Sequence, residues 1–589
     1  MIVSILESHL IAYQIDVKPV LGVHVSAYRS SNGCWTCRLR RKKCDEQHPV
    51  CDGCGALNLT CHYGQEKPAW MDGGVRQEEM ADLLRRKVKE RGHRRVWNHS
   101  RSGLAGATAL NTRSTTAYGQ GAEPCPEALD GTFQRKGSCK FAPSEPYSSA
   151  IGQSDDSVLI MFYIEHVFPF LFPFYQPPLL QGGRAWILKM MMTSPVVRQA
   201  ALCQSSYFFS LSRGAAHGDP LWETVLKQTR EAFEVLRQAL QVISESNVAE
   251  HLHGAVRVMS SIMQVQRFEI AVLSLNNCQS HLNAALALFK QLLDSAGAIE
   301  PSTVRSSFET VMNRLGTSSR SLALVEPFPS AEQAAFRFSS SLLILDDIVA
   351  STVLQERPRL YEYHHGLLED AHGTRPVIDL EDVVGCQNWA LVQIAEIAVL
   401  DAWKQRCKSS GTLDMLELVR RATAIKDSLE THLAILEGYT ASNYEDNGVL
   451  DVLTAKSTTA NQKPLVTLAW AHAALIYLSV VVSGWQPASA EIRFHVRRLI
   501  EVPVREISPP ALLRTMVWPL CVAGCLAEPE LATQFSGIIE ALQPRSVFGT
   551  LQKALEVMQN VWRSGNSTEA AGRDLAACFR NQGDLVLLV

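Results

Sequence analysis

The sequence of 589 residues lacks the short motifs that identify several common classes of enzyme. It contains no P-loop, no G-x-S-x-G nucleophile elbow and no H-E-x-x-H metalloprotease motif, so none of these chemistries is expected. Stretches of alternating apolar and polar residues are few, which disfavours a β-sheet protein, and no repeat of fixed period is present, which disfavours a solenoid. These absences favour a helical protein that is not an enzyme.

Signals for secretion and for membrane insertion are also sparse. The first residues, MIVSILESHLIAYQ, lack a basic start and are interrupted by Glu7, so no signal peptide is expected. The apolar run at 157–175 contains Glu165 and two prolines, which makes it a poor membrane span. Residues 464–485 carry no formal charge and are long enough to span a bilayer, but His472 and the helical surroundings favour a buried core helix. No membrane partner is expected.

Excess positive charge is absent from most of the chain and concentrated near one end. The formal net charge is −3. Between Cys34 and Arg101, 15 lysines and arginines outnumber nine acidic residues, whereas residues 102–589 hold 39 basic and 48 acidic residues. A basic segment joined to a larger, mildly acidic remainder predicts a head that binds a polyanion and a body of ordinary protein composition.

Six of the fifteen cysteines lie within 28 residues, with the spacing Cys34-x2-Cys37-x6-Cys44-x6-Cys51-x2-Cys54-x6-Cys61. The pattern is a C-x2-C-x6-C unit that occurs twice. A C-x2-C pair places two thiolates on one turn, and a third cysteine about two helical turns later can return to the same metal ion. Two tetrahedral zinc ions need about eight bonds and six thiolates supply six, so two sulfurs must bridge. The symmetry of the repeat assigns the bridges to Cys34 and Cys51.

Redox and iron–sulfur chemistry fit the cysteine cluster less well than zinc does. A redox C-x-x-C pair would not need six thiols, and an iron–sulfur cluster uses about four cysteines, which leaves two over. The nine remaining cysteines are scattered, mostly in apolar helical contexts, so they indicate a reducing compartment and not a disulfide framework. They are Cys125, Cys139, Cys203, Cys278, Cys386, Cys407, Cys521, Cys525 and Cys578.

The stretch CWTCRLRRKKCDEQHPVCDGC closely resembles the fungal six-cysteine binuclear zinc cluster of transcription factors, including Pro49 two residues before Cys51. The resemblance implies two zinc ions held by all six cysteines, with the same bridging pair that the repeat assigns, and a nuclear protein that binds DNA. A module of ~30 residues buries too little apolar surface to fold alone, so zinc would supply its folding free energy.

The basic residues of the first half of the repeat are Arg38, Arg40, Arg41, Lys42 and Lys43, whereas the matching residues 55–60 of the second half carry no charge. Clustered cations repel one another unless a polyanion is near, so double-stranded DNA is the expected ligand. By the resemblance, Arg40 and Arg41 read bases, usually in CGG-type triplets, and the other three contact phosphates. Many family members have lysine where Arg41 stands, but arginine can also bind guanine bidentately.

Composition along the chain predicts five segments. They are a disordered lead-in (1–30), a binuclear zinc cluster domain (31–66), a basic linker with a helix (67–97), a disordered linker rich in Ser, Gly and Thr (98–156) and an all-α regulatory domain (157–589). The helix expected from residue 77 to about 91 has an apolar side of barely two heptads, which is short for a coiled coil. A homodimer built on it is therefore an alternative to a monomer. Basic residues 85–95 are candidates for phosphate contacts or a nuclear import signal.

From about residue 157, apolar residues recur every three or four positions, as in LWETVLKQTREAFEVLRQALQVI and FGTLQKALEVMQNVW. The predicted fold class is a small zinc-nucleated binuclear cluster head joined by a flexible linker to a large all-α domain. This domain resembles the regulatory body of fungal transcription factors. The segment YEYHHGLLEDAH, residues 361–372, gathers side chains that could bind a metal, but a surface loop after Tyr363 is expected instead. Cys521 and Cys525 are expected to be buried thiols.

These features predict a nuclear, sequence-specific regulator of RNA polymerase II genes. Its expected partners are double-stranded DNA and the transcription machinery or co-regulators. Many relatives govern one metabolic pathway or a secondary-metabolite gene cluster, and no residue pattern here selects one. Two alternatives stay open: a helical enzyme or small-molecule sensor that the zinc head only localises, and a zinc-stabilised module that binds proteins.

Overall fold

The computed structural model divides the chain into two compact units, a head (Gly22–Glu145) and a body (Pro146–Val589 together with Met1–Leu21). In the head it describes residues 34–40, 49–55, 59–63 and most of 68–86. In the body it describes 152–178, 182–214, 220–245, 248, 250–273, 278–295, 304–316, 329–369, 375–440, 459–564 and 574–579. The predicted lead-in (1–30) and nearly all of the predicted linker (98–156) lie outside these residues.

The head is built from short helices. Cys34 has an extended backbone and its Sγ accepts a hydrogen bond from the backbone N of Cys37 at 3.3 Å, which begins α2 (Trp35–Leu39). The second half of the cysteine repeat begins α3 (Asp52–Gly55) at the equivalent position, directly after Cys51. The described residues between 76 and 86 are also helical, in agreement with the helix predicted there.

The described part of the body consists of helices without strands, as its periodicity predicts. The elements up to the middle of the chain are α5 (Gly152–Phe162), the π-helix η1 (Tyr163–Val167), α6 (Phe168–Leu171), α7 (Ala185–Thr193), α8 (Pro195–Ser212), α9 (Pro220–Glu245), α10 (Leu252–Ala271), α11 (Cys278–Asp294), α12 (Val304–Leu315), α13 (Ala331–Leu354) and α14 (Tyr361–Leu368). The later elements are α15 (Glu381–Val384), α16 (Asn388–Ser410), α17 (Met415–Thr440), the 3-10 helix η4 (Ala460–Gln462), α19 (Lys463–Ser483), α20 (Ala490–Leu499), the π-helix η5 (Ile500–Val504), the 3-10 helix η6 (Pro510–Met516), α21 (Val517–Cys525), α22 (Pro529–Glu540), the 3-10 helix η7 (Arg545–Val547), α23 (Gly549–Arg563) and α24 (Leu575–Phe579).

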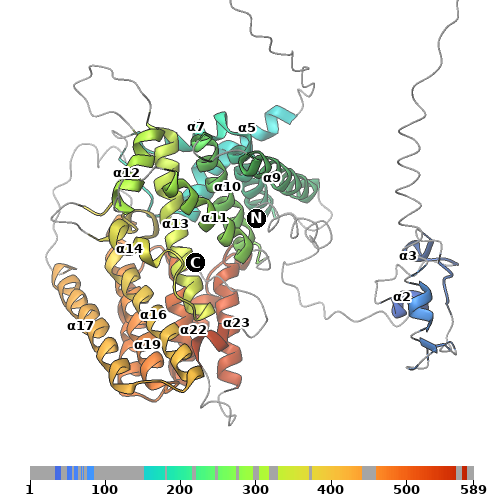
Figure 1. The fold of residues 1–589 in the computed structure, drawn as a ribbon. Helices are drawn as coiled ribbons and strands as arrows, with labels where there is room; N and C mark the ends of the chain where they lie inside the picture. The colour runs from blue at the N-terminus through green and yellow to red at the C-terminus, as the bar shows by residue number, and fades with distance from the viewer. Residues whose placement is uncertain are drawn as a thin grey trace, which may run out of the picture. The chain divides into compact units, whose positions relative to one another are not determined.

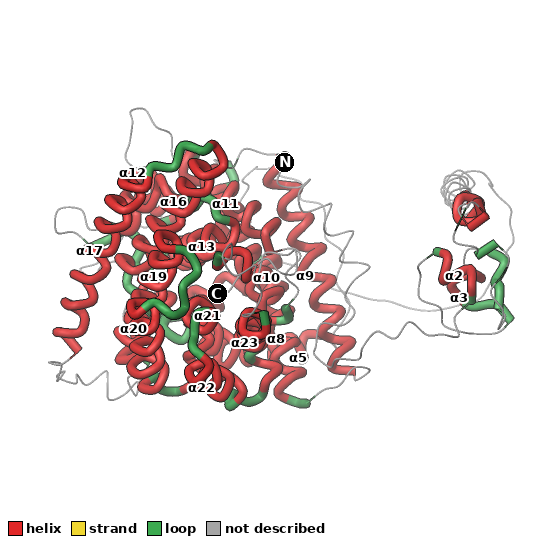
Figure 2. Tube along the Cα trace, turned by 90° about the horizontal axis from the view of Figure 1, so that it is seen from below, coloured by secondary structure: helices red, strands yellow, loops and turns green. Residues whose placement is uncertain are grey.

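Helix α13 is the central element of the body. It passes between α10 and α11 on one side and α16 on the other (Figures 1 and 2). A capping box fixes its start, because Ser330 Oγ accepts a hydrogen bond from Gln333 N at 3.0 Å while Gln333 Oε1 accepts one from Ser330 N at 2.7 Å. Every residue from Phe338 to Val353 is buried, including two aspartates. Helices from both halves of the body therefore share one core around α13.

Helix α19 contains most of the uncharged run 464–485. It is the one helix in the described part of the chain that is long and apolar enough to cross a bilayer, and 83% of its most apolar window is buried. Its neighbours are α16, α17, α20 and α21, and Trp470 stacks on Trp518 of α21 with ring centroids 5.4 Å apart. The prediction of a buried core helix is confirmed.

One local expectation is wrong. Residues 361–368 form the helix α14 and not a surface loop, and His364 on it is buried. Burial lowers the pKa of His364 to about 4, so its imidazole is neutral at physiological pH. His365 is exposed and pairs with Glu369 at 2.5 Å, which is an ordinary contact along one helix face. The buried thiols expected at Cys521 and Cys525 are confirmed.

Gly385 should be intolerant of a side chain. It ends α15 with a φ of 80°, and a Cβ there would lie 2.4 Å from Cδ2 of Phe174. We expect Gly385→Ala to lower the free energy of unfolding by ~2–4 kcal/mol, from backbone strain together with overpacking. Gly411 is the matched control, because its φ is 68° and no atom lies within 4 Å of the position that a Cβ would occupy. Chemical denaturation should show a loss of only ~1 kcal/mol for Gly411→Ala; equal losses at the two positions would contradict the packing argument.

Candidate metal centre

The two C-x2-C pairs occupy equivalent places in the head. Cys34 precedes α2 and Cys37 lies in its first turn, while Cys51 precedes α3 and Cys54 lies within it. Each pair therefore presents two sulfurs from the start of a short helix, as the spacing predicts. Cys61 follows in the next described stretch, and the backbone N of Cys51 lies 3.5 Å from its Sγ.

The sulfur atoms lie at the spacing that tetrahedral zinc requires. A Zn–S bond of about 2.3 Å places neighbouring sulfurs of a tetrahedron about 3.8 Å apart. The separation is 3.8 Å from Cys34 Sγ to both Cys51 Sγ and Cys54 Sγ, and 3.6 Å from Cys37 Sγ to Cys51 Sγ. Cys34, Cys51, Cys54 and Cys61 together place all four sulfurs within 4.8 Å of one another. The donor set and its geometry fit one zinc ion at these four residues.

The structure describes five of the six predicted zinc ligands, and their sulfurs come together in one cluster. These five are Cys34, Cys37, Cys51, Cys54 and Cys61. Cys44 lies outside the described residues. The four-sulfur set contains Cys34 and Cys51, the pair that the repeat assigns as bridges. Their place in a second site with Cys37 and Cys44 stays a prediction.

The electrostatics of the cluster call for a cation. Burial raises the pKa of the Cys34 thiol well above its ordinary value and that of Cys54 to about 11, so without a metal both sulfurs would keep their protons at neutral pH. A divalent metal displaces these protons because it binds thiolates. The apolar core around the cluster is small, with Leu59 and Leu84 as its buried aliphatic members. Metal coordination must therefore supply much of the folding free energy of the head.

Hydrogen bonds tie α2 to the stretch that carries Cys61. The Thr36 hydroxyl donates to the carbonyl oxygen of Thr60 at 2.7 Å, and the backbone N of Trp35 donates to the carbonyl oxygen of His62 at 2.8 Å. Thr36 Oγ1 also lies 3.1 Å from His62 Nδ1. Sequence reasoning missed these supporting residues, because no spacing rule links positions that lie so far apart in the chain.

The helical residues between 76 and 86 have a contact that the sequence did not indicate. Leu84 is buried against the cysteine cluster and Met80 packs beside it, whereas Leu83 is exposed. Two apolar residues of the short seam expected for a coiled coil therefore face the head's own cysteines. This contact leaves a shorter apolar surface for a second chain than the sequence suggested.

The predicted DNA-contacting residues are described in part. Arg38 lies in the last turn of α2, and its guanidinium carbon sits 4.5 Å from the centre of the Trp35 ring. Arg40 follows at the C-terminal cap of α2. Both are only partly buried. Arg41, Lys42 and Lys43 lie outside the described residues, so their contacts stay predictions.

Two family comparisons match this architecture. Residues 32–69 match the fungal Zn(2)-Cys(6) binuclear cluster domain, and residues 158–584 match the fungal specific transcription factor domain. The second match covers most of the helical body.

Several curated proteins resemble the chain over most of its length. Transcription factor dibT of Pestalotiopsis microspora is 32% identical, with 95% of this chain and 99% of that protein aligned. Pestheic acid cluster transcriptional regulator 3 of Pestalotiopsis fici is 28% identical over 85% of this chain and 88% of its own. The ustiloxin B cluster transcription factor ustR of Aspergillus flavus is 26% identical over 91% and 95%. No solved structure matches the chain.

Chelation should open the head and leave the body folded. Removing the metal with EDTA should expose Cys34, Cys37, Cys51 and Cys54, which are buried, because their own apolar core is too small to hold them together. Reaction with a thiol reagent should then accelerate at the head cysteines, as mapped by mass spectrometry. Cys203 in the body is the internal control, because it is buried by helix packing alone. Equal labelling of the head cysteines with and without EDTA would contradict a metal-held head.

Proposed function

Because the chain belongs to the fungal transcription factors that join a Zn(2)-Cys(6) binuclear cluster to a fungal specific transcription factor domain, we propose that its head holds two zinc ions and reads CGG-like triplets in duplex DNA. The chain is a zinc-containing, DNA-binding transcription regulator. The number of ions, the base contacts and the class of target gene are the finer parts of the proposal.

The two-ion centre rests on the shared pair. One ion takes Cys34, Cys51, Cys54 and Cys61, whose sulfurs lie within 4.8 Å of one another. The other takes Cys37 and Cys44 and shares Cys34 and Cys51. Cys37 Sγ lies 3.6 Å from Cys51 Sγ, close to the edge expected for two ligands of one zinc ion, and 3.8 Å from Cys54 Sγ. The symmetry of the repeat, and not these distances, assigns Cys37 to the second ion. The zinc ions hold α2 and α3 in place and take no part in a reaction.

DNA contact is assigned to the cationic stretch that begins in α2. Arg40 and Arg41 read guanine edges in the major groove, and Arg38, Lys42 and Lys43 contact phosphates. Arg38 and Arg40 lie at the end of a helix whose start is fixed by two cysteine ligands, so metal binding orients the basic residues. Thr60 and Leu59, in the uncharged stretch 55–60 of the second half of the repeat, brace this helix.

The proposed targets are genes of a secondary-metabolite cluster, transcribed by RNA polymerase II in the nucleus. The support is the names of relatives, two of which are regulators of the pestheic acid and ustiloxin B clusters. The body would then recruit the transcription machinery or co-regulators. A homodimer is the second assembly to test, although Met80 and Leu84 contact the chain's own cysteine cluster.

Zinc counting separates bridging from terminal ligands. In the purified full-length protein, Cys51→Ala should lose both zinc ions, because it removes a ligand from each, whereas Cys61→Ala should retain about one per chain. Metal content measured by mass spectrometry checks both values, and Cys203→Ala, a buried body thiol, should keep the wild-type content. Equal zinc loss in the Cys51 and Cys61 variants would contradict the shared-ligand arrangement.

Base reading and phosphate contact should differ in their response to sequence. Arg41→Ala should weaken binding to a CGG site by ~1–3 kcal/mol and flatten the preference for it over mutated triplets. Fluorescence anisotropy on matched and mutated duplexes measures both effects.

The control for Arg41 is Lys42→Ala in the same cationic stretch. Its loss should be similar on every duplex, and it should reduce the slope of log affinity against log salt by about 0.9. If Arg41→Ala weakened all duplexes equally, its base-reading role would be wrong. If EDTA left specific duplex binding intact, the alternative of a protein-interaction module would replace DNA recognition by the zinc head.

A further inference from the structure

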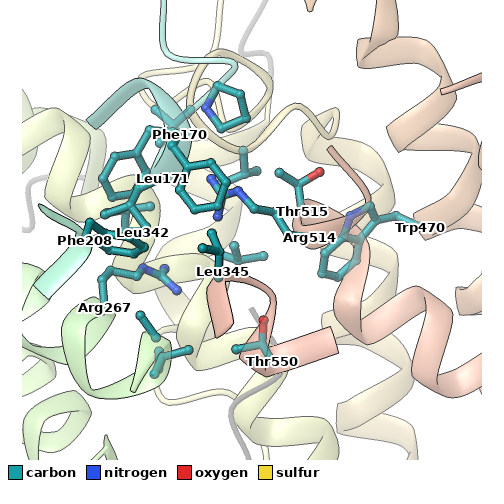
Figure 3. A pocket seen from close by; sticks show the side chains of 18 residues that line it. Phe170, Leu171, Phe208, Arg267, Leu342, Leu345, Trp470, Arg514, Thr515 and Thr550 are labelled. Atoms are coloured by element: carbon teal, nitrogen blue, oxygen red, sulfur yellow. The ribbon is translucent and has the colours of Figure 1, made fainter. Parts of the chain in front are cut away.

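The body contains a cavity where helices from both halves of the chain meet (Figure 3). Its walls come from α6, α8, α10, α13, α15, α19, η6, η7 and α23. The cavity has a volume of about 90 Å³, which holds about three waters or a compact molecule of a few carbon atoms. Most of the lining is apolar, with Phe170, Phe208, Leu342 and Leu345 among it.

Two arginines enter this apolar space from different elements, Arg267 from α10 and Arg514 from η6 (Figure 3). Arg267 Nη2 donates to Asp346 Oδ1 at 2.6 Å, and Asp346 is fully buried. The Nε of Arg267 is buried and has no hydrogen-bond partner among the described residues. One carboxylate thus satisfies only part of one guanidinium.

Arg514 has no such counter-charge in the described part of the chain. Its Nη2 is buried without a hydrogen-bond partner, and its guanidinium carbon lies 4.3 Å from the centre of the Phe170 ring. A contact with a ring face stabilises a cation less than a carboxylate does. Burial, and second the nearby Arg267, lower the pKa of Arg514 to about 9, so it still carries its charge at neutral pH. The cavity therefore holds more positive than negative charge.

A buried charge without a partner is costly, because removal from water is not offset by a Coulombic attraction. Core positions of purely structural value are filled more stably by an apolar side chain of similar volume. Two cationic groups with unsatisfied N–H donors that line one cavity are instead what an anion requires. The apolar walls disfavour a fully hydrated inorganic anion and favour one that carries a hydrocarbon part.

We propose that this cavity binds a small organic carboxylate with a short, branched aliphatic body. The carboxylate accepts hydrogen bonds from Arg514 Nη2 and Arg267 Nε, and the hydrocarbon part lies against Phe170, Leu342 and Leu345. Trp470 lines the same space, and its Nε1 is buried with no partner among the described residues, so it can donate to a polar substituent of the ligand.

The ligand would join parts of the body that are distant in sequence. Arg267 belongs to the half of the body before α13, and Arg514 to the half after it. A molecule that is held by both arginines links the two halves of the body. Its binding stabilises the folded body by mass action. The site lies within the helical unit, so its occupancy can be measured without DNA and independently of the zinc head.

The first test uses wild-type full-length protein and three probes, isobutyrate, isovalerate and pivalate. At least one of these carboxylates should raise the Tm of the body in a concentration-dependent manner. It should also change tryptophan fluorescence, because Trp470 in the cavity wall stacks on Trp518. The matched neutral amides, isobutyramide among them, should bind at least tenfold more weakly, because they lack the charge that the arginines recognise. No effect from any carboxylate, or equal binding of acid and amide, would overturn the proposal.

The second test removes the unpaired charge. Arg514→Met should fold, because it replaces a buried cation by an apolar side chain, and should weaken the carboxylate by about tenfold to a hundredfold. Arg505→Met is the matched control, because Arg505 is exposed on a neighbouring segment and should leave binding unchanged. Wild-type affinity in Arg514→Met would overturn the assignment. If Arg514→Met failed to fold, the Arg514→Lys variant and the comparison of acid with amide on the wild type would still test whether the cavity binds a carboxylate.

Discussion

Coordination of a cation by buried cysteine sulfurs is the interaction on which the head depends. Four sulfurs lie within 4.8 Å of one another, and the aliphatic side chains buried beside them are Leu59 and Leu84. A core of this size cannot offset the conformational entropy of the segments it joins. The metal does so, and in the same step it fixes the start of α2, from which the basic residues extend. Folding of the head and orientation of its basic residues are thus one event.

The body reaches stability by the opposite route. Its helices bury apolar side chains around α13 and α19, both of which are enclosed over most of their length. Some polar groups inside it are matched: Asp347 Oδ2 accepts from the backbone N of Leu360 at 2.8 Å, and Glu269 pairs with His281 at 2.7 Å. Other buried side-chain atoms lack a partner among the described residues, and Arg514 differs from the neutral ones because it carries a charge that no carboxylate balances there.

Local patterns in the sequence predicted most of the fold and the clustering of the described cysteines of the head. The doubled C-x2-C-x6-C spacing brought five described cysteines to one cluster, and the three-to-four periodicity predicted a helical body. Features that depend on distant residues escaped prediction. His364 is buried because α14 packs on α12 and α16, whereas its own segment, rich in charged and polar residues, resembled a loop. Packing between elements also brings Met80 and Leu84 against the cysteines, and it places Arg267 and Arg514 in one cavity. No periodic pattern in the sequence indicates either arrangement.

The two units share one physical problem, a charged group removed from water. In the head, the cysteine thiolates are removed from water. If no cation were bound, burial would raise the pKa of these thiols and they would take up protons. In the body, guanidinium groups are desolvated, and one of them has no carboxylate beside it in the described part of the chain. Zinc solves the first problem with ions that are part of the folded structure. The second is solved only in part by Asp346, which pairs with Arg267 through Oδ1, while its Oδ2 has no partner among the described residues. A site that is satisfied internally is a structural one, whereas a site left with unmatched charge gains stability from a ligand that comes and goes. The same rule of charge compensation therefore makes the cysteine cluster permanent and the arginine cavity responsive to its surroundings.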